Sequence, residues 1–209
     1  MHNHKIMRAI AFAAVCLLTG CLARPHLDKQ MFAFATPPTA TLKAAAGGRV
    51  LGLRSVEVAE PFEGRSFVYR SGESSYDRDP YAEFMAPPEE ELVSPVCSWL
   101  RGTGIFSAVE ETGSALKPNT LLEVHVTQLY GDFRPGEGAA AVLAIRFEFF
   151  DAPHGIPGKA LLQREYASKI LLKERTAVAL MAGWNEGLAK ILDSTGSDLE
   201  QLNANGQKP

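Results

Sequence analysis

The sequence lacks the short motifs that most readily reveal a catalytic centre. Its 209 residues contain no G-x-S-x-G nucleophile motif, no P-loop, no H-E-x-x-H metalloprotease motif and no G-x-G-x-x-G dinucleotide motif. Histidine and cysteine, the commonest ligands in metal centres, are scarce, with five and three residues respectively. We therefore expect that the protein is not an enzyme.

Long hydrophobic runs and clusters of basic residues are also missing. The N-terminal apolar run, residues 9–18, is about half as long as the roughly 20 residues that a membrane-spanning helix needs. Lysine and arginine number 21 against 24 acidic residues, which gives a net charge of −3. This balance argues against a nucleic-acid partner and against a general basic membrane-binding face.

The N-terminus has the pattern of a lipoprotein signal peptide. Lys5 and Arg8 precede the apolar run, and the run ends in Leu18, Thr19, Gly20 and Cys21. Small residues at 19 and 20 give a signal peptidase access to the backbone, and the Cys21 thiol accepts the lipid. We therefore predict a signal peptide over residues 1–20 that is recognised through positions 18–20, and lipidation of Cys21. The alternative is an ordinary signal peptide that contains a cysteine.

The predicted lipoprotein signal peptide also leads to predictions of the compartment and of the domain limits. An aspartate after the acylated cysteine commonly retains a lipoprotein in the inner membrane, and this chain has Leu22 there. We therefore expect an anchor in the outer membrane, at its periplasmic face. Residues 21–28 form a lipidated tether of at most about 25 Å. Residues 29–203 form one domain, and residues 204–209 a flexible tail.

The remaining cysteine has no partner for a disulfide within the mature chain. Cys16 is removed with the signal peptide, and Cys21 carries the lipid, so Cys97 is left alone. It lies in an amphipathic segment. We expect it to be a small buried hydrophobic side chain rather than a reactive thiol.

Apolar periodicity predicts an α+β fold in which an antiparallel sheet carries two helices on one face. The last three strands, linked by loops rich in glycine and proline, form an antiparallel meander. Gly52 is a candidate β-bulge. The expected strands are residues 29–35, 49–58, 67–70, 76–84, 105–109, 121–130, 139–151 and 160–171.

The two expected helices have recognisable ends. The first opens with the segment Pro87 to Glu91 and is ended by the glycines at 102 and 104. Pro95 lies inside it and either kinks the helix or delays its start. The second begins near residue 177 and ends at Gly196, with a weaker extension to residue 202. Its glycines at 183 and 187 permit a close approach of the helix to the sheet.

Polar groups that could carry chemistry have simpler structural explanations. The histidines after Cys21 are dispersed, at positions 26, 125 and 154, and we interpret each as an ordinary polar residue. Asp77 and Asp79 are interleaved with Arg70 and Arg78, as is usual of a solvated strand edge. We predict no catalytic, metal-binding or cofactor-binding residue, and no cofactor apart from the covalent lipid.

The middle of the chain is rich in aromatic residues, methionine and arginine, the types that are enriched at the cores of protein–protein interfaces. We single out five partner-interface candidates: Tyr69, Arg70, Tyr81, Phe84 and Met85. A second interpretation stays open, because only half of a strand's side chains can point inward. In it, alternate aromatics face the core and the others are ordinary edge residues.

The order of these features resembles the ABC-type transport auxiliary lipoprotein family, also called the PqiC/YmbA-like family. That family has a lipobox, an aromatic strand, a valine-rich strand, a Tyr-Arg pair, a tyrosine-containing strand leading into a helix, a Gly-x-Phe turn and a C-terminal helix. The corresponding residues are 18–21, 32–34, 50–58, 68–70, 76–88, 104–106 and 177–192. Phe84-Met85-Ala86-Pro87 stands where the family often has Trp-Ala-x-Pro.

The resemblance implies a role in transport across the cell envelope. The family is associated with ABC transport systems that use an MCE-domain protein and move lipids or other hydrophobic compounds. By resemblance, this protein is a non-catalytic component that docks the MCE assembly at the outer membrane, with an MCE-domain partner and a homo-oligomer among the expected associations. Two alternatives stay open: a lipid-carrying periplasmic binding protein, and an assembly factor for an outer-membrane protein.

Overall fold

The computed structural model describes residues 28–39, 41–42, 48–111, 117–153 and 155–205. The expected signal peptide, nearly all of the lipidated tether and residues 206–209 of the expected tail lie outside the described residues. Within those ranges, no helix is both long and apolar enough to cross a membrane.

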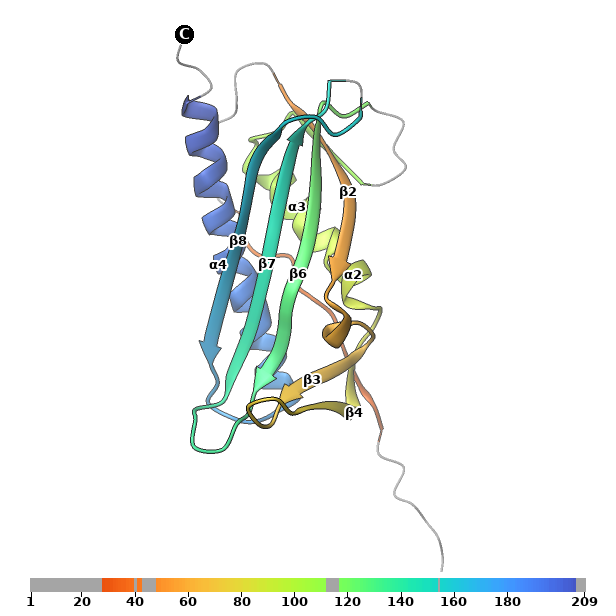
Figure 1. The fold of residues 1–209 in the computed structure, drawn as a ribbon, viewed down its shortest axis with the longest axis vertical. Helices are drawn as coiled ribbons and strands as arrows, with labels where there is room; N and C mark the ends of the chain where they lie inside the picture. Colours follow the sequence, from red (N-terminus) through yellow and green to blue (C-terminus); the bar gives the residue numbers. More distant parts are fainter. Residues whose placement is uncertain (1–27, 40, 43–47, 112–116, 154, 206–209) are drawn as a thin grey trace, which may run out of the picture.

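The centre of the molecule is a meander of three long strands (Figure 1). β6 (Thr120–Asp132), β7 (Ala140–Asp151) and β8 (Ala160–Leu171) pair antiparallel in sequence order. Along β6 and β7 the side chains alternate between the core and the opposite face, as expected for a sheet with one covered face. The predicted meander is confirmed.

The other five strands make the sheet mixed. β2 (Val50–Val58) runs parallel to β6 and to β5 (Ala108–Glu110). β3 (Ser66–Arg70) runs parallel to the end of β6 and antiparallel to β4 (Tyr76–Phe84), which in turn is parallel to β1 (Gln30–Phe32). The α+β class is confirmed, but the prediction of a purely antiparallel sheet is wrong. Apolar alternation carries no information on strand direction, and the helical connection between β4 and β5 returns the chain to the end where β2 begins.

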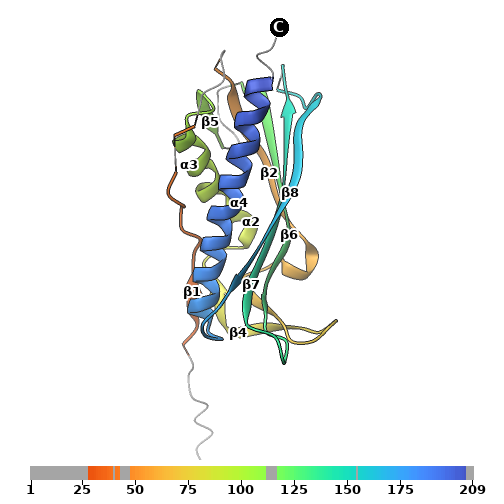
Figure 2. The same cartoon turned by 90° about the vertical axis from the view of Figure 1, so that its left-hand side faces the viewer.

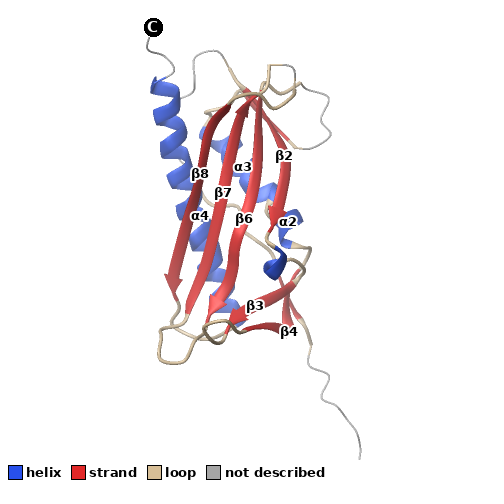
Figure 3. Ribbon diagram, viewed as in Figure 1, coloured by secondary structure: helices blue, strands red, loops and turns tan. Residues whose placement is uncertain are grey.

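The α-helices of the described chain lie on one face of the sheet, as predicted (Figures 2 and 3). The short 3-10 helix η1 (Glu60–Phe62), which follows β2, does not belong to this layer. The first predicted helix is divided into α2 (Pro88–Glu91) and α3 (Val93–Thr103). The break falls at Leu92 because Pro95 has no N–H to donate to the carbonyl of Glu91. Gly104, with φ of 70°, ends α3 in the left-handed conformation that glycine adopts without strain.

The second predicted helix is longer than its glycines suggested. α4 (Ala177–Asn205) continues through Gly196, so the prediction that this residue ends the helix is wrong. A Cβ atom at position 196 would lie 2.8 Å from the Trp99 ring. One at Gly183 would lie 2.7 Å from the Ala141 Cβ atom. These glycines therefore let α4 approach α3 and the sheet closely, and packing outweighs their low helix propensity.

Smaller elements differ from the sequence prediction at their limits. β1 is three residues long rather than seven, and Ile105 and Phe106 are buried but precede β5 instead of belonging to it. The β-bulge in β2 lies between Leu53 and Ser55 and not at Gly52. Gly52 is required for another reason, because a Cβ atom there would lie 2.8 Å from the Pro118 ring.

The space between sheet and helices is filled by large side chains. Trp184 is fully buried, and its indole N–H donates to the Val142 carbonyl oxygen at 3.1 Å. Cys97 is also fully buried, as predicted, and burial raises the pKa of its thiol to about 11. The largest fully buried side chains include Trp99, Trp184, Phe67, Phe84, Phe147 and Phe149.

Candidate functional site

The predicted lipidation site lies outside the described residues, as do positions 18–20. The described chain begins at Asp28, two residues before β1. β1 lies beside β4 at the end of the molecule that also holds β3 and the start of α4 (Figure 2). The attachment point of the expected tether is therefore at this end, which we call the tether end.

Two of the five interface candidates are exposed at the tether end. Met85 is 60 % exposed and Tyr81 is 48 % exposed. Phe84, between them, is buried in the core, where its ring centroid lies 5.6 Å from that of Trp184. The prediction that Phe84 belongs to an interface is therefore wrong. The alternation of the strand explains the difference, because Ala82 and Phe84 point towards α4.

A further exposed side chain lies beside them, and the sequence analysis did not single it out. Met31 is 60 % exposed on the edge strand β1, opposite Glu83 of β4. Glu83 accepts hydrogen bonds from Lys29 at 3.0 Å and from Arg65 at 3.1 Å. We call Met31, Tyr81 and Met85 the tether-side surface. The sequence feature that could have identified Met31 is the short alternating run around Phe32, in which Met31 faces outward.

Tyr69 and Arg70 have internal roles in the β3–β4 hairpin. The Tyr69 hydroxyl donates to Asp79 Oδ2 at 2.6 Å, and its half-buried ring stacks on Phe133 with centroids 4.9 Å apart. Burial and the Asp79 carboxylate raise the pKa of Tyr69 well above its ordinary value. Arg70 donates to the carbonyl oxygens of Gly72 and Glu73 in the turn. Both residues therefore shape the hairpin.

The carboxylate at position 79 also has a structural role. Asp79 Oδ1 accepts the backbone N–H groups of Tyr81 at 2.7 Å and Ala82 at 3.0 Å, where the pairing of β3 with β4 shifts register. With the Tyr69 hydroxyl on its other oxygen, this carboxylate accepts three hydrogen bonds. The Asp79 carboxylate therefore stabilises the irregular part of β4 from which the Tyr81 side chain is exposed.

An open groove of about 380 Å³ lies over the tether-end half of β6, β7 and β8, and it holds a nearly buried carboxylate. The Asp132 side chain is 2 % exposed and accepts two hydrogen bonds from Arg134, at 2.8 and 2.7 Å, and one from Lys169 at 3.2 Å. The Arg134 guanidinium, assisted by Lys169, holds the pKa of Asp132 well below its usual range. Arg70 completes the cationic lining of the groove.

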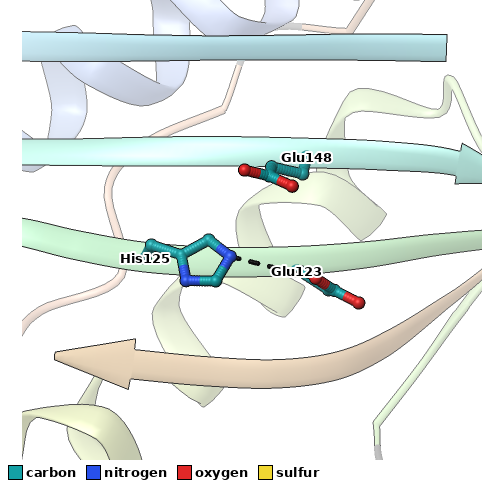
Figure 4. A group of neighbouring side chains, drawn as sticks. All are labelled: Glu123, His125 and Glu148. Carbon is teal, nitrogen blue, oxygen red and sulfur yellow. Dashed lines mark ion pairs between the residues drawn. The ribbon is translucent and has the colours of Figure 1, made fainter. Parts of the chain in front are cut away.

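The outward face of the sheet also brings together three side chains, of which the sequence analysis considered only His125. Glu123 and His125 are two residues apart on β6, and Glu148 lies opposite Glu123 on β7 (Figure 4). One potential ligand atom from each lies within 4.8 Å of the others. His125 is therefore part of a carboxylate–histidine cluster. The i, i+2 spacing was visible in the sequence, but the register that adds Glu148 was not.

The comparisons with known proteins identify similar folds. No protein-family model and no curated protein matches this chain. Among solved structures, a Xanthomonas campestris protein described under the family DUF330 aligns with a TM-score of 0.71 and 14 % identity, covering 86 % of this chain and 100 % of that one.

Two further structures align less closely. An uncharacterised protein has a TM-score of 0.59 and 15 % identity over 82 % of this chain and 99 % of its own. The hypothetical protein CT253 from Chlamydia trachomatis has a TM-score of 0.49 and 11 % identity, covering 75 % of this chain and 98 % of its own. At these identities the likeness concerns the fold. The protein thus shares its α+β architecture with the DUF330 protein across nearly the whole domain.

Proposed function

We propose that this protein is a membrane-anchored periplasmic lipoprotein of the ABC-type transport auxiliary family that docks an MCE assembly at the outer membrane. Its partner is an MCE-domain protein of an ABC transport system for lipids or other hydrophobic compounds. It contributes position and a binding surface, and no catalytic step. The observation that carries this proposal is the exposed apolar surface at the tether end.

Exposed apolar side chains gather where the anchored chain enters the domain. Met31, Tyr81 and Met85 are each about half exposed or more, and the described chain begins three residues before Met31. A tether of at most about 25 Å keeps this end close to the membrane surface. Methionine and tyrosine supply adaptable apolar contact area at protein interfaces. This arrangement supports a docking surface at a fixed height above the membrane.

The packing of the core favours docking over carriage of a lipid inside the domain. A carrier needs a cavity between sheet and helices, and that space is occupied by fully buried rings such as Phe67, Phe147 and Trp184. Phe67 packs edge-on against Trp184 with centroids 4.8 Å apart. A lipid chain could enter only by displacing these rings, which would leave their close contacts unmade.

Co-purification of the detergent-extracted lipoprotein with its envelope partners tests the docking surface. Replacing Met31 and Met85 by glutamate introduces two charges into the apolar contact area, so recovery of an MCE-domain partner falls by about tenfold or more. The matched control is Ile156→Glu. Ile156 is 70 % exposed in the β7–β8 loop at the opposite end of the molecule, and its replacement leaves recovery unchanged.

Replacing Cys21 by alanine tests the anchor separately. The unlipidated protein keeps its circular dichroism spectrum and melting temperature but loses membrane association and transport function. Full transport function in the unlipidated variant would contradict the tethering role. Equal partner recovery by the Met31/Met85 double variant and the Ile156 control would contradict the docking surface.

A further inference from the structure

We propose that Glu123, His125 and Glu148 form a binding site for a divalent zinc ion on the outward face of the sheet. The proposal replaces the expectation from sequence that His125 is an ordinary polar residue. It is independent of the proposed docking role, because the cluster lies on the open face of β6 and β7 and not on the tether-side surface.

Strand geometry fixes the three side chains on one face. Glu123 and His125 are separated by Val124, which is fully buried in the core, so both point away from the helices. The register of the antiparallel pair sets Glu148 opposite Glu123. All three residues lie on long central strands, which hold side chains more rigidly than loops do.

The distances suit a small metal ion. The Nε2 atom of His125 lies 3.9 Å from Oε2 of Glu123, and one ligand atom of Glu148 lies within 4.8 Å of both residues' ligand atoms. Zinc binds histidine nitrogen and carboxylate oxygen at about 2.0–2.2 Å, so its neighbouring ligand atoms stand roughly 3–4 Å apart. Small torsional changes of Glu148 bring the widest pair into that range.

A fourth residue orients the imidazole for this role. Nδ1 of His125 lies 3.2 Å from Oε2 of Glu57 on β2. A carboxylate beside Nδ1 holds the ring proton on that nitrogen and leaves the Nε2 lone pair directed at Glu123 and Glu148. Metal-binding histidines commonly have this second partner, which fixes their tautomer and raises their basicity as ligands.

The surrounding donors hold the carboxylates in place. Arg146 and Gln163 donate to Oε1 of Glu148 at 2.8 and 2.9 Å, and Arg54 donates to Oε1 of Glu123. The Glu123 oxygen nearest to His125 is the other one, Oε2. The Glu123 and Glu148 side chains are 17 % and 12 % exposed, so water reaches them only partly.

Charge and donor type decide which ion fits. Three carboxylates, counting that of Glu57, face two guanidinium groups, so these five groups together carry one negative charge. A divalent cation compensates this charge, while the two guanidinium groups weaken its binding. Imidazole as a ligand favours zinc over magnesium and calcium, which prefer all-oxygen sites.

Isothermal titration of the metal-stripped, detergent-purified full-length lipoprotein with zinc chloride tests the site. At about pH 7 the protein binds one zinc per chain. Magnesium chloride under the same conditions produces no saturable binding.

Matched variants assign the binding to these residues. His125→Asn and Glu148→Gln each weaken zinc binding by about tenfold or more. Two controls leave it unchanged: His154→Ala, which removes another histidine, and Glu165→Gln, which removes a carboxylate on the same face of β8 that accepts the Thr127 hydroxyl. Circular dichroism of each variant verifies the fold. Cobalt absorption in the visible range gives a second readout that is sensitive to the ligand set.

Three results would overturn the assignment. Binding only at millimolar zinc would show that the cluster is a cross-strand ladder of ion pairs. An equal loss of affinity in the His154 and His125 variants would place the ion elsewhere. Equal affinity for magnesium would contradict the role of the imidazole.

Discussion

At the scale of single residues, several carboxylates that were candidates for catalysis or ligand binding instead accept hydrogen bonds that stabilise the fold. Asp79 orders the irregular part of β4, Asp132 binds Arg134 and Lys169 across the sheet, and Asp198 of α4 accepts the Tyr166 hydroxyl at 2.5 Å. Hydrogen bonds to the ionised form lower the pKa of Asp132 and of Asp198. Their ionisation is therefore linked to the stability of the folded state.

The linkage is strongest for Asp132 because its carboxylate is nearly buried. Its pKa is lower in the folded protein than in the unfolded chain, so its contribution to stability is present above about pH 4 and is lost as the pH falls towards the folded value. Asp132→Asn should lower the free energy of unfolding at pH 7 by about 1–3 kcal/mol. Urea unfolding followed by circular dichroism should show this deficit shrinking below about pH 4. Asp193→Asn, at an exposed carboxylate of α4, is the control; a deficit for Asp132→Asn that is the same at every pH would contradict the linkage.

Two glycines of α4 should respond differently to the same substitution. Gly183→Ala places a methyl group 2.7 Å from the Cβ atom of Ala141, which cannot rotate away, so overpacking of about 1–3 kcal/mol exceeds the helix-propensity gain of about 1 kcal/mol. Gly187→Ala meets the Ser168 hydroxyl at 3.2 Å, which can turn aside. Thermal melts should therefore show a lower melting temperature for the Gly183 variant and an unchanged or higher one for the Gly187 variant. The reverse order would be inconsistent with the close packing of α4 on β7.

At the scale of elements, an ionic contact at Asp198 joins the far half of α4 to the edge strand β8. Asp198 accepts hydrogen bonds from Arg164 at 2.8 and 2.7 Å and from Tyr166, while Thr195 and Leu199 on the same half are buried. This contact joins the last turns of the helix to a strand that pairs on one side only.

Removing that contact should loosen a defined part of the molecule. Asp198→Ala should cost about 1 kcal/mol, since the Arg164 side chain is largely exposed and its ion pair is screened by solvent. Hydrogen exchange measured by mass spectrometry should accelerate over residues 193–202 and along β8, with residues 177–188 unchanged. Ser197→Ala, which removes only a hydroxyl bonded to the preceding turn, serves as the control. Uniform acceleration along α4 would contradict a local role.

At the scale of the whole molecule, the domain is an elongated sheet with one covered face (Figures 1 and 2). α4 has 29 residues and therefore extends about 44 Å, and the 13 residues of β6 extend about 43 Å. Both run between the tether end and the opposite end. The domain thus separates the tether-side surface from the loops at the opposite end by about 40 Å.

The buried thiol gives a probe of cooperative unfolding for the whole domain. Cys97 is fully buried and its pKa is raised to about 11, so native protein should resist alkylation at neutral pH. Modification of Cys97 should become rapid only across the urea transition that circular dichroism detects. Fast labelling in native buffer would indicate local opening around α3.

The amino-acid sequence alone was sufficient to predict the α+β class, the strand meander and the burial of Cys97. These features depend on local periodicity and turn composition, which each segment carries independently of the rest of the chain. Of the residues predicted as interface candidates, Tyr81 and Met85 are exposed and Phe84 is buried, and the exposed Met31 was not anticipated.

Only the tertiary structure decided strand direction, the length of α4 and the assembly of the histidine cluster. Each depends on which segments meet. Gly196 stays helical because it faces Trp99, and Glu148 joins His125, 23 residues earlier in the chain, through the register between β6 and β7. Period-two alternation specifies which face a side chain occupies but not its neighbour on the next strand. Pairing between distant segments is fixed by the packing of the complete core, and so it is absent from any local stretch of sequence.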